Sequence, residues 1–431
     1  MVRLLDLPAE LIFLIVDELG CRDRYKLGVT CRRFSLLALP DIHSKCYMQF
    51  CNYAYTYVHR VGGPKGILDR PDYTGFKKYG SYVKELYVNC GFPVIKLPNY
   101  NKQWLMDQAQ ELIEERSCRT IANQLELVIP GFTTLTTAYF MPDHSAGDLR
   151  PGAGPVFEIR MIRMIVRSCR SIKKLSIGLD YNPYFRDDSK ELEKLENELN
   201  IETDSNARVS SQSRLTDLSI RLMDKHYGIN LDSTYCILRM LCGVLHGPAK
   251  TVTRFSFDFS ASPRYRDPLP PPPMPAVPNG QGLDLKMVET MDLGMERPEC
   301  CQILLPGFFH FDSTKVKQMK LQNVSYEKEH AAEGIDLISE FYGLKTLTLH
   351  YPGLSLWPSA ILKAQKEGLI SLKELQILIS GSYLDYEALE DILHDNDSMY
   401  KYNYEMQESD NSSPLYYGSL GKTLLKFDFD T

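Results

Sequence analysis

Residues 344–377 read LKTLTLHYPGLSLWPSAILKAQKEGLISLKELQI and contain one short pattern twice. An apolar residue is followed by two others, a second apolar residue, one other and a third apolar residue. The two sets of apolar positions are Leu344, Leu347 and Leu349, and Leu372, Leu375 and Ile377. The last three positions of each copy alternate apolar, polar, apolar, which is the period of a half-buried strand. We expect both copies to be strands that bury these side chains and pair in parallel.

The same pattern recurs along most of the chain. Further copies are VKELYV from Val83, IKKLSI from Ile172, LTDLSI from Leu215, VTRFSF from Val252, VKQMKL from Val316 and LLKFDF from Leu424, with a weaker copy, QLELVI, from Gln124. Stretches with the period of an amphipathic helix lie between copies, at 104–116, 157–170, 233–245, 334–341 and 360–366. The sequence therefore predicts strands alternating with helices.

This alternation resembles an irregular leucine-rich-repeat array, a solenoid in which neighbouring repeats bury one another's apolar edges. The spacing between copies is about 28 residues near the C-terminus and over about 60 near residues 268–278, so the repeats would carry insertions. A mixed α/β globule shares the same alternation and stays an alternative.

Three segments interrupt the pattern. Residues 187–206 are rich in charge and indicate a solvated helix or loop, and residues 268–278, PLPPPPMPAVP, favour a polyproline II spacer. The polar, tyrosine-rich residues 398–414 indicate an exposed loop before the last strand. Five tyrosines are expected to pack the junction that precedes the array: Tyr25, Tyr47, Tyr53, Tyr55 and Tyr57.

The first 39 residues predict three short helices. The first would begin near Leu7, with Pro8 in its first turn, and would end at Gly20. Apolar residues at three- and four-residue spacing give it a broad apolar face: Leu11, Ile12, Ile15, Val16 and Leu19. The other helices are expected at 23–28 and 30–39. So small a unit can bury little by itself, and part of its apolar surface is expected to await a partner.

The N-terminal segment resembles the F-box family, in the form common in fungal proteins. The resemblance lies in the string LPxEL…I…L…D…L…CRRF, formed by Leu7, Pro8, Glu10, Leu11, Ile15, Leu19, Asp23, Leu27, Cys31, Arg32, Arg33 and Phe34. Arg24 and Thr30 depart from the residues usual in the family. The resemblance implies three helices that dock on the Skp-type adaptor of a cullin–RING ubiquitin ligase. The adaptor-binding residues it implies are Leu7, Pro8, Leu11, Ile15, Leu19, Leu27, Cys31 and Phe34.

The expected organisation is an F-box at 1–45, a junction at 46–80 and an irregular leucine-rich-repeat-like domain at 81–431. This is an α+β or α/β chain. By resemblance it is the substrate receptor of a Skp–cullin–F-box ligase, and it would hold an unknown target protein near the ubiquitin-charged enzyme. Two alternatives stay open: the N-terminal helices could be a cap on the array, and the chain could be a protein-interaction scaffold without a ligase.

Composition excludes several other classes of function. The formal net charge of −6, with both signs interspersed, argues against nucleic acid as a partner. Acidic residues break the N-terminal apolar run, and no stretch reaches the ~18 apolar residues that span a bilayer, so we expect a soluble protein of the cytoplasm or nucleus. Eleven scattered cysteines without a CxxC pair indicate reduced thiols, and the adjacent Cys300 and Cys301 lack zinc-site neighbours.

No stretch of the sequence assembles a reaction centre. A phosphate-binding glycine loop, a GxSxG elbow and an HExxH motif are all absent, and the nine histidines occur singly. The sequence therefore predicts a recognition subunit that is not an enzyme and that has no cofactor or metal.

Overall fold

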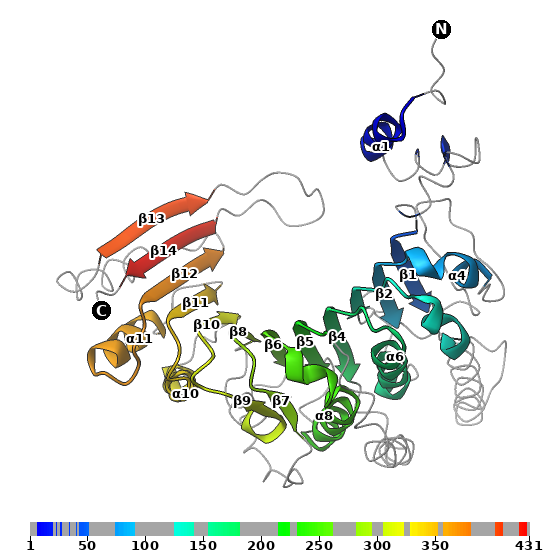
Figure 1. Cartoon of the computed structure of the whole chain (residues 1–431). Helices are drawn as coiled ribbons and strands as arrows, with labels where there is room; N and C mark the ends of the chain where they lie inside the picture. The colour runs from blue at the N-terminus through cyan, green and yellow to red at the C-terminus, as the bar shows by residue number, and fades with distance from the viewer. Residues whose placement is uncertain are drawn as a thin grey trace, which may run out of the picture. The chain divides into compact units, whose positions relative to one another are not determined.

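The structure is a computed structural model, and it describes part of the chain. The described residues are 7–19, 23, 26–27, 34, 40, 43–50, 74–90, 125–141, 154–181, 214–224, 231–261, 282–294, 305–322, 328–351, 357–380, 401–407 and 422–428. The chain divides into two compact units, residues 1–215 and residues 216–431. Both units are mixed α/β and contain neighbouring parallel strands (Figure 1).

Among its described residues, the first unit contains four parallel strands in the order β1-β2-β3-β4. Its elements are α1 (Ala9–Asp17), β1 (Lys45–Phe50), α4 (Thr74–Tyr79), η2 (Gly80–Tyr82), β2 (Glu85–Cys90), η3 (Ile129–Gly131), β3 (Thr137–Met141), α6 (Gly154–Ser168) and β4 (Lys174–Tyr181). Strand β1 lies at the start of the stretch expected as a junction and pairs with β2. The sheet therefore begins earlier in the chain than the sequence pattern predicts.

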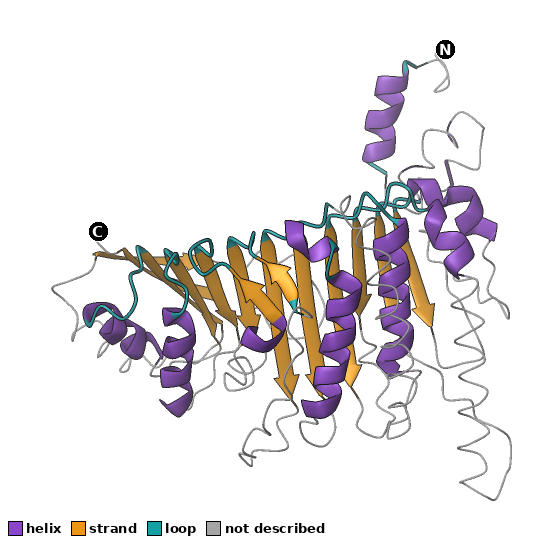
Figure 2. Ribbon diagram, turned by 60° about the horizontal axis from the view of Figure 1, so that its bottom comes forward, coloured by secondary structure: helices purple, strands orange, loops and turns teal. Residues whose placement is uncertain are grey.

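The second unit has the strand order β5-β6-β8-β10-β11-β12-β14-β13, and a separate two-stranded sheet joins β7 to β9. Its strands are β5 (Asp217–Asp224), β6 (Arg254–Ala261), β7 (Leu283–Leu285), β8 (Thr290–Gly294), β9 (Phe309–Phe311), β10 (Gln318–Gln322), β11 (Thr346–Tyr351), β12 (Glu374–Ser380), β13 (Lys401–Gln407) and β14 (Lys422–Asp428). Its helices are α8 (Leu231–Leu245), η5 (Pro248–Thr251), α10 (Lys328–Ser339) and α11 (Trp357–Lys366). Figure 2 shows these helices on one face of the sheet.

The apolar positions of the repeated pattern form the core. Leu347 and Leu349 of β11 lie in register with Leu375 and Ile377 of β12, and the two strands are parallel. All four side chains are buried, as are Leu344 and Leu372. The pairing and burial predicted for this pair of strands are confirmed. Four of the expected helices also correspond to α6, α8, α10 and α11, whereas 104–116 lies outside the described residues.

Two copies that match the same pattern were not recognised in the sequence. LTTAYF from Leu135 enters β3 and VETMDL from Val288 enters β8, and both bury their three patterned side chains. Ala138 and Met291 hold the middle position in these copies, and alanine in particular is a weak strand signal. The strand predicted for the weak copy from Gln124 is wrong, because its residues from Leu125 onward are helical.

The C-terminal end of the second unit also differs from expectation. The copy from Leu424 forms β14, but β14 pairs antiparallel with β12, so the expectation of parallel strands is wrong there. Residues 401–407, expected in a loop, form β13, which pairs antiparallel with β14. The tyrosine and lysine residues of β13 are compatible with an edge strand. The segments 187–206 and 268–278, the pair Cys300 and Cys301, and Tyr25, Tyr53, Tyr55 and Tyr57 lie outside the described residues.

Buried cysteines act as small apolar side chains in both units. Cys46, Cys169 and Cys242 are free and buried. Burial raises the pKa of Cys169 and of Cys242 to about 12, and it raises the pKa of Cys46 further. These thiols are therefore protonated and unreactive at neutral pH.

A substitution in the apolar row tests whether this row holds the second unit together. We expect Leu347→Ala to lower the free energy of unfolding by about 2–5 kcal/mol, because it removes a fully buried side chain between two flanking strands. Thr348→Ala, at the next and partly exposed position of the same strand, is expected to cost about 1 kcal/mol or less. Urea unfolding of both variants provides the comparison. Similar losses for the two would contradict the assignment of the core.

Candidate docking site on the N-terminal helix

Helix α1 is apolar on two sides. Ile12 and Val16 are fully buried against Phe34, and the partly buried Leu7 and Leu27 pack on this cluster. On the other side Leu11, Leu14 and Ile15 are 46%, 62% and 37% exposed. We call these three side chains the outer stripe. Their three- and four-residue spacing places them on one face of the helix.

The local sequence explains where the helix begins and ends. Pro8 occupies the N-cap position with φ −52° and ψ 150°, an extended conformation that proline adopts readily, and its carbonyl accepts the amide N–H of Ile12. Glu10 lies in the first turn, where a negative charge is favourable. The helix spans Ala9–Asp17, so it begins two residues later than expected and ends before Gly20.

Seven of the eight residues implied by the F-box resemblance separate into three groups. Pro8, Leu11 and Ile15 are exposed, Leu7, Leu19 and Leu27 are partly buried, and Phe34 is buried. Cys31 lies outside the described residues. Leu14, the most exposed member of the outer stripe, was missed, although its position three residues after Leu11 could have identified it.

Helical residues are also present where the second and third helices are expected. Asp23, Lys26, Leu27 and Phe34 are each helical, and Lys26 Nζ lies 3.2 Å from Asp23 Oδ1, one helical turn away. Leu27 and Phe34 bring these segments onto the inner side of α1. The inner side of the helix is therefore occupied by the protein's own side chains, and the outer stripe is left exposed.

The outer stripe can act by burial of apolar area. It carries no titratable group, so its chemistry suits a hydrophobic groove that accepts side chains one helical turn apart. Among the described residues, no group of three or more side chains that could hold a metal ion comes together. The helices of the described segments are also too short or too polar to cross a membrane.

A second surface lies on the sheet of the second unit, on the face opposite the buried side chains of the repeated pattern. Arg221 Nε lies 2.9 Å from Asp258 Oδ2 on the neighbouring strand, and Gln322 donates to both carboxylate oxygens of Asp292 at 2.8 and 2.6 Å. Gly294 follows Leu293, which pairs with Phe257, and the Asp258 carboxylate lies where a Cβ at 294 would be. Any larger residue at position 294 would displace this carboxylate.

Burial is the main influence on the two carboxyl groups of this surface. It raises the pKa of Asp258, an effect opposed by Arg221 and strengthened by the nearby Asp292. Burial also raises the pKa of Asp292, against the effects of Lys320 and Gln322. Both groups are therefore held in an environment that favours the protonated form.

No protein-family model matches the chain, and a search of curated proteins finds no match either.

The raised pKa of Asp258 predicts a pH dependence of stability. A carboxyl group whose pKa is higher in the folded than in the unfolded protein contributes its full stabilisation at pH values below the unfolded-state pKa. This contribution is lost as the pH rises through the folded-state pKa. We therefore expect Asp258→Asn to raise the free energy of unfolding, relative to the wild type, more at pH 7 than at about pH 4. Urea unfolding at the two pH values measures the difference. A smaller gain in the free energy of unfolding at pH 7 than at the lower pH would mean that the ion pair with Arg221 outweighs the effect of burial on Asp258.

Proposed function

We propose that this chain is the substrate-receptor subunit of a Skp–cullin–F-box ubiquitin ligase. Residues 1–45 would act as the F-box, and the strands that follow would present a target protein. The observation that carries the proposal is the outer stripe of α1, Leu11, Leu14 and Ile15, exposed on a helix whose inner side is already packed. The stripe lies in the segment that resembles the F-box family.

The geometry of α1 supports docking over the alternative of an N-terminal cap. A cap would bury its apolar ridge against the domain behind it, whereas Leu11 and Ile15 stay exposed while Ile12 and Val16 are buried. Exposed apolar side chains in a contiguous group are typical of interaction sites. The helix would enter a hydrophobic groove of the Skp-type adaptor through this stripe.

The parallel strands support the second half of the proposal. Copies of one pattern lie side by side in register with helices on one face, as expected for an irregular leucine-rich-repeat-like array. Such an array offers a long surface to a target protein. The chain itself would perform no chemistry, and it would raise the local concentration of a target lysine near the charged conjugating enzyme.

Truncation of the outer stripe tests the proposal. We expect the double variant Leu11→Ala, Ile15→Ala of the full chain to bind the Skp-type adaptor more weakly by roughly two to four powers of ten, since each buried interface side chain contributes ~1–3 kcal/mol. Isothermal titration calorimetry measures the affinity. Circular dichroism of the variant is expected to match the wild type, because both side chains are exposed in the free protein.

The matched control removes an exposed leucine elsewhere in the first unit. Leu127 is 66% exposed and lies outside residues 1–45, so Leu127→Ala is expected to leave adaptor affinity unchanged. An affinity loss below about threefold in the double variant would refute the docking role of the stripe. Wild-type protein that does not bind the adaptor at all would leave the scaffold without a ligase as the better interpretation.

A further inference from the structure

Three lysines stand next to one another directly before successive strands of the second unit, β10, β11 and β12. Lys317, Lys345 and Lys373 each occupy the second position of a copy, and all three side chains are exposed. The carbonyl of Lys317 accepts the amide N–H of Lys345 at 2.8 Å, and the carbonyl of Lys345 accepts that of Lys373 at 2.8 Å. The backbones of this lysine row are therefore separated by the usual strand spacing of about 4.8 Å.

The row ends beside Glu289, whose carbonyl accepts the amide N–H of Lys317 at 2.9 Å, and it contrasts with the cross-strand charge pairs of the same unit. Elsewhere the sheet places opposite charges across neighbouring strands, as with Asp217 and Arg254 at 3.6 Å and with Arg221 and Asp258 at 2.9 Å. Within the described part of the chain, none of the three row lysines forms an ion pair. Like charges in register on neighbouring strands destabilise a sheet, so cross-strand stabilisation does not explain the row.

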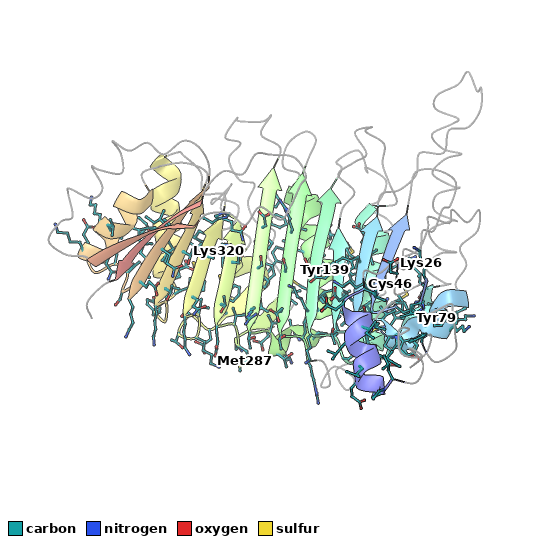
Figure 3. The ribbon with its side chains drawn as sticks, turned by 90° about the horizontal axis from the view of Figure 1, so that it is seen from above. Lys26, Cys46, Tyr79, Tyr139, Met287 and Lys320 are labelled. Carbon is teal, nitrogen blue, oxygen red and sulfur yellow. The ribbon has the colours of Figure 1, made fainter. Side chains whose placement is uncertain are left out.

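Exposed apolar side chains occur on the loops that lead into these strands. Met287 precedes the copy that enters β8, Tyr342 precedes β11 and is 82% exposed, and Leu369 precedes β12. They are the large exposed hydrophobic residues among the described residues of the second unit. Figure 3 shows Met287 at the tails of the strand arrows, the end at which the copies begin.

Side-chain and backbone contacts hold these loops against one another. Lys315 Nζ lies 3.5 Å from Met287 Sδ on the neighbouring loop. The amide of Gly343 donates to the carbonyl of Ser313 at 3.0 Å, and the Thr314 carbonyl occupies the place of a Cβ at 343. Only glycine permits this close approach. Basic and apolar side chains are thus fixed along one edge, which we call the strand-start edge: Lys317, Lys345, Lys373, Met287, Tyr342 and Leu369.

We propose that the strand-start edge binds an acidic segment of a partner protein, with carboxylates on the lysine row and apolar side chains against Met287, Tyr342 and Leu369. Single ammonium groups spread over three strands suit a chain that carries repeated carboxylates. They do not converge on one point, as a site for a single anion would. The interleaved apolar side chains favour an acidic polypeptide that also carries apolar residues over nucleic acid.

This inference deepens the proposed function, since it names the class of target segment. It rests on that proposal for its link to ubiquitin transfer only. Binding at the strand-start edge can be measured in the full chain without the adaptor.

The experiment is fluorescence anisotropy of a labelled peptide with the full-length protein. The probe is a 16-residue fluorescein-labelled peptide in which glutamates alternate with serine and leucine, and a second peptide carries glutamine in place of every glutamate. We expect the acidic peptide to bind and the glutamine peptide to bind at least about tenfold more weakly. The triple variant Lys317→Gln, Lys345→Gln, Lys373→Gln should bind the acidic peptide about fivefold more weakly or worse. Tyr342→Ala should also weaken binding, at unchanged net charge.

The matched control changes three exposed lysines elsewhere, Lys77→Gln, Lys363→Gln and Lys366→Gln, and alters net charge equally. An equal loss in this control would overturn the proposal, because it would mean general charge attraction. No binding by wild-type protein at about 100 µM, or equally tight binding of a labelled oligothymidylate, would also overturn it. The variant Leu11→Ala, Ile15→Ala should bind the peptide normally. Loss of adaptor binding alone therefore counts against the ligase proposal, and loss of peptide binding alone counts against this one.

Discussion

One backbone interaction, repeated from strand to strand, determines how the copies of the pattern stack. The carbonyl of the second residue in a copy accepts two amide N–H groups from the next copy, as Lys317 does from Lys345 and Thr346 at 2.8 and 3.1 Å. The same pair of hydrogen bonds occurs in the first unit, where the carbonyl of Lys84 accepts the amide N–H groups of Thr136 and Thr137. Because this pair of hydrogen bonds fixes the register at the start of each strand, every apolar position that follows lies beside its equivalent on the neighbouring strand. Burial of those side chains then stabilises the alignment.

The sequence predicted the parts of the fold in which one local pattern encodes both a strand and the positions that the strand buries. Leu347 and Leu375 lie in register because each is the middle apolar residue of a copy. The prediction failed where tertiary context overrides the pattern. Leu125 to Val128 repeats the apolar spacing but is helical, and β14 carries the pattern but pairs antiparallel. Strand direction is set by the connection that returns through β13, which no local spacing encodes.

The candidate docking site was predictable to a similar extent. Helical spacing identifies one broad apolar face on α1, and it does not say which half packs inward. The structure divides that face between Ile12 and Val16, which contact Phe34, and the exposed Leu11, Leu14 and Ile15. The inner half depends on Phe34, which is distant in sequence, so periodicity alone cannot locate it. The lysine row escaped notice for the same reason, since its members become neighbours only when copies stack.

The regular spacing of the copies near the C-terminus has an evolutionary consequence. From Val288 to Leu372 the middle apolar residues Met291, Met319, Leu347 and Leu375 follow one another at a constant interval and occupy equivalent register positions. Each copy contacts mainly its two neighbours, so duplication or loss of one whole interval would lengthen or shorten the sheet without altering the remaining pairs. Recombination between copies is then a route by which the extent of the surface can drift among descendants of this gene, while the N-terminal helix remains unchanged.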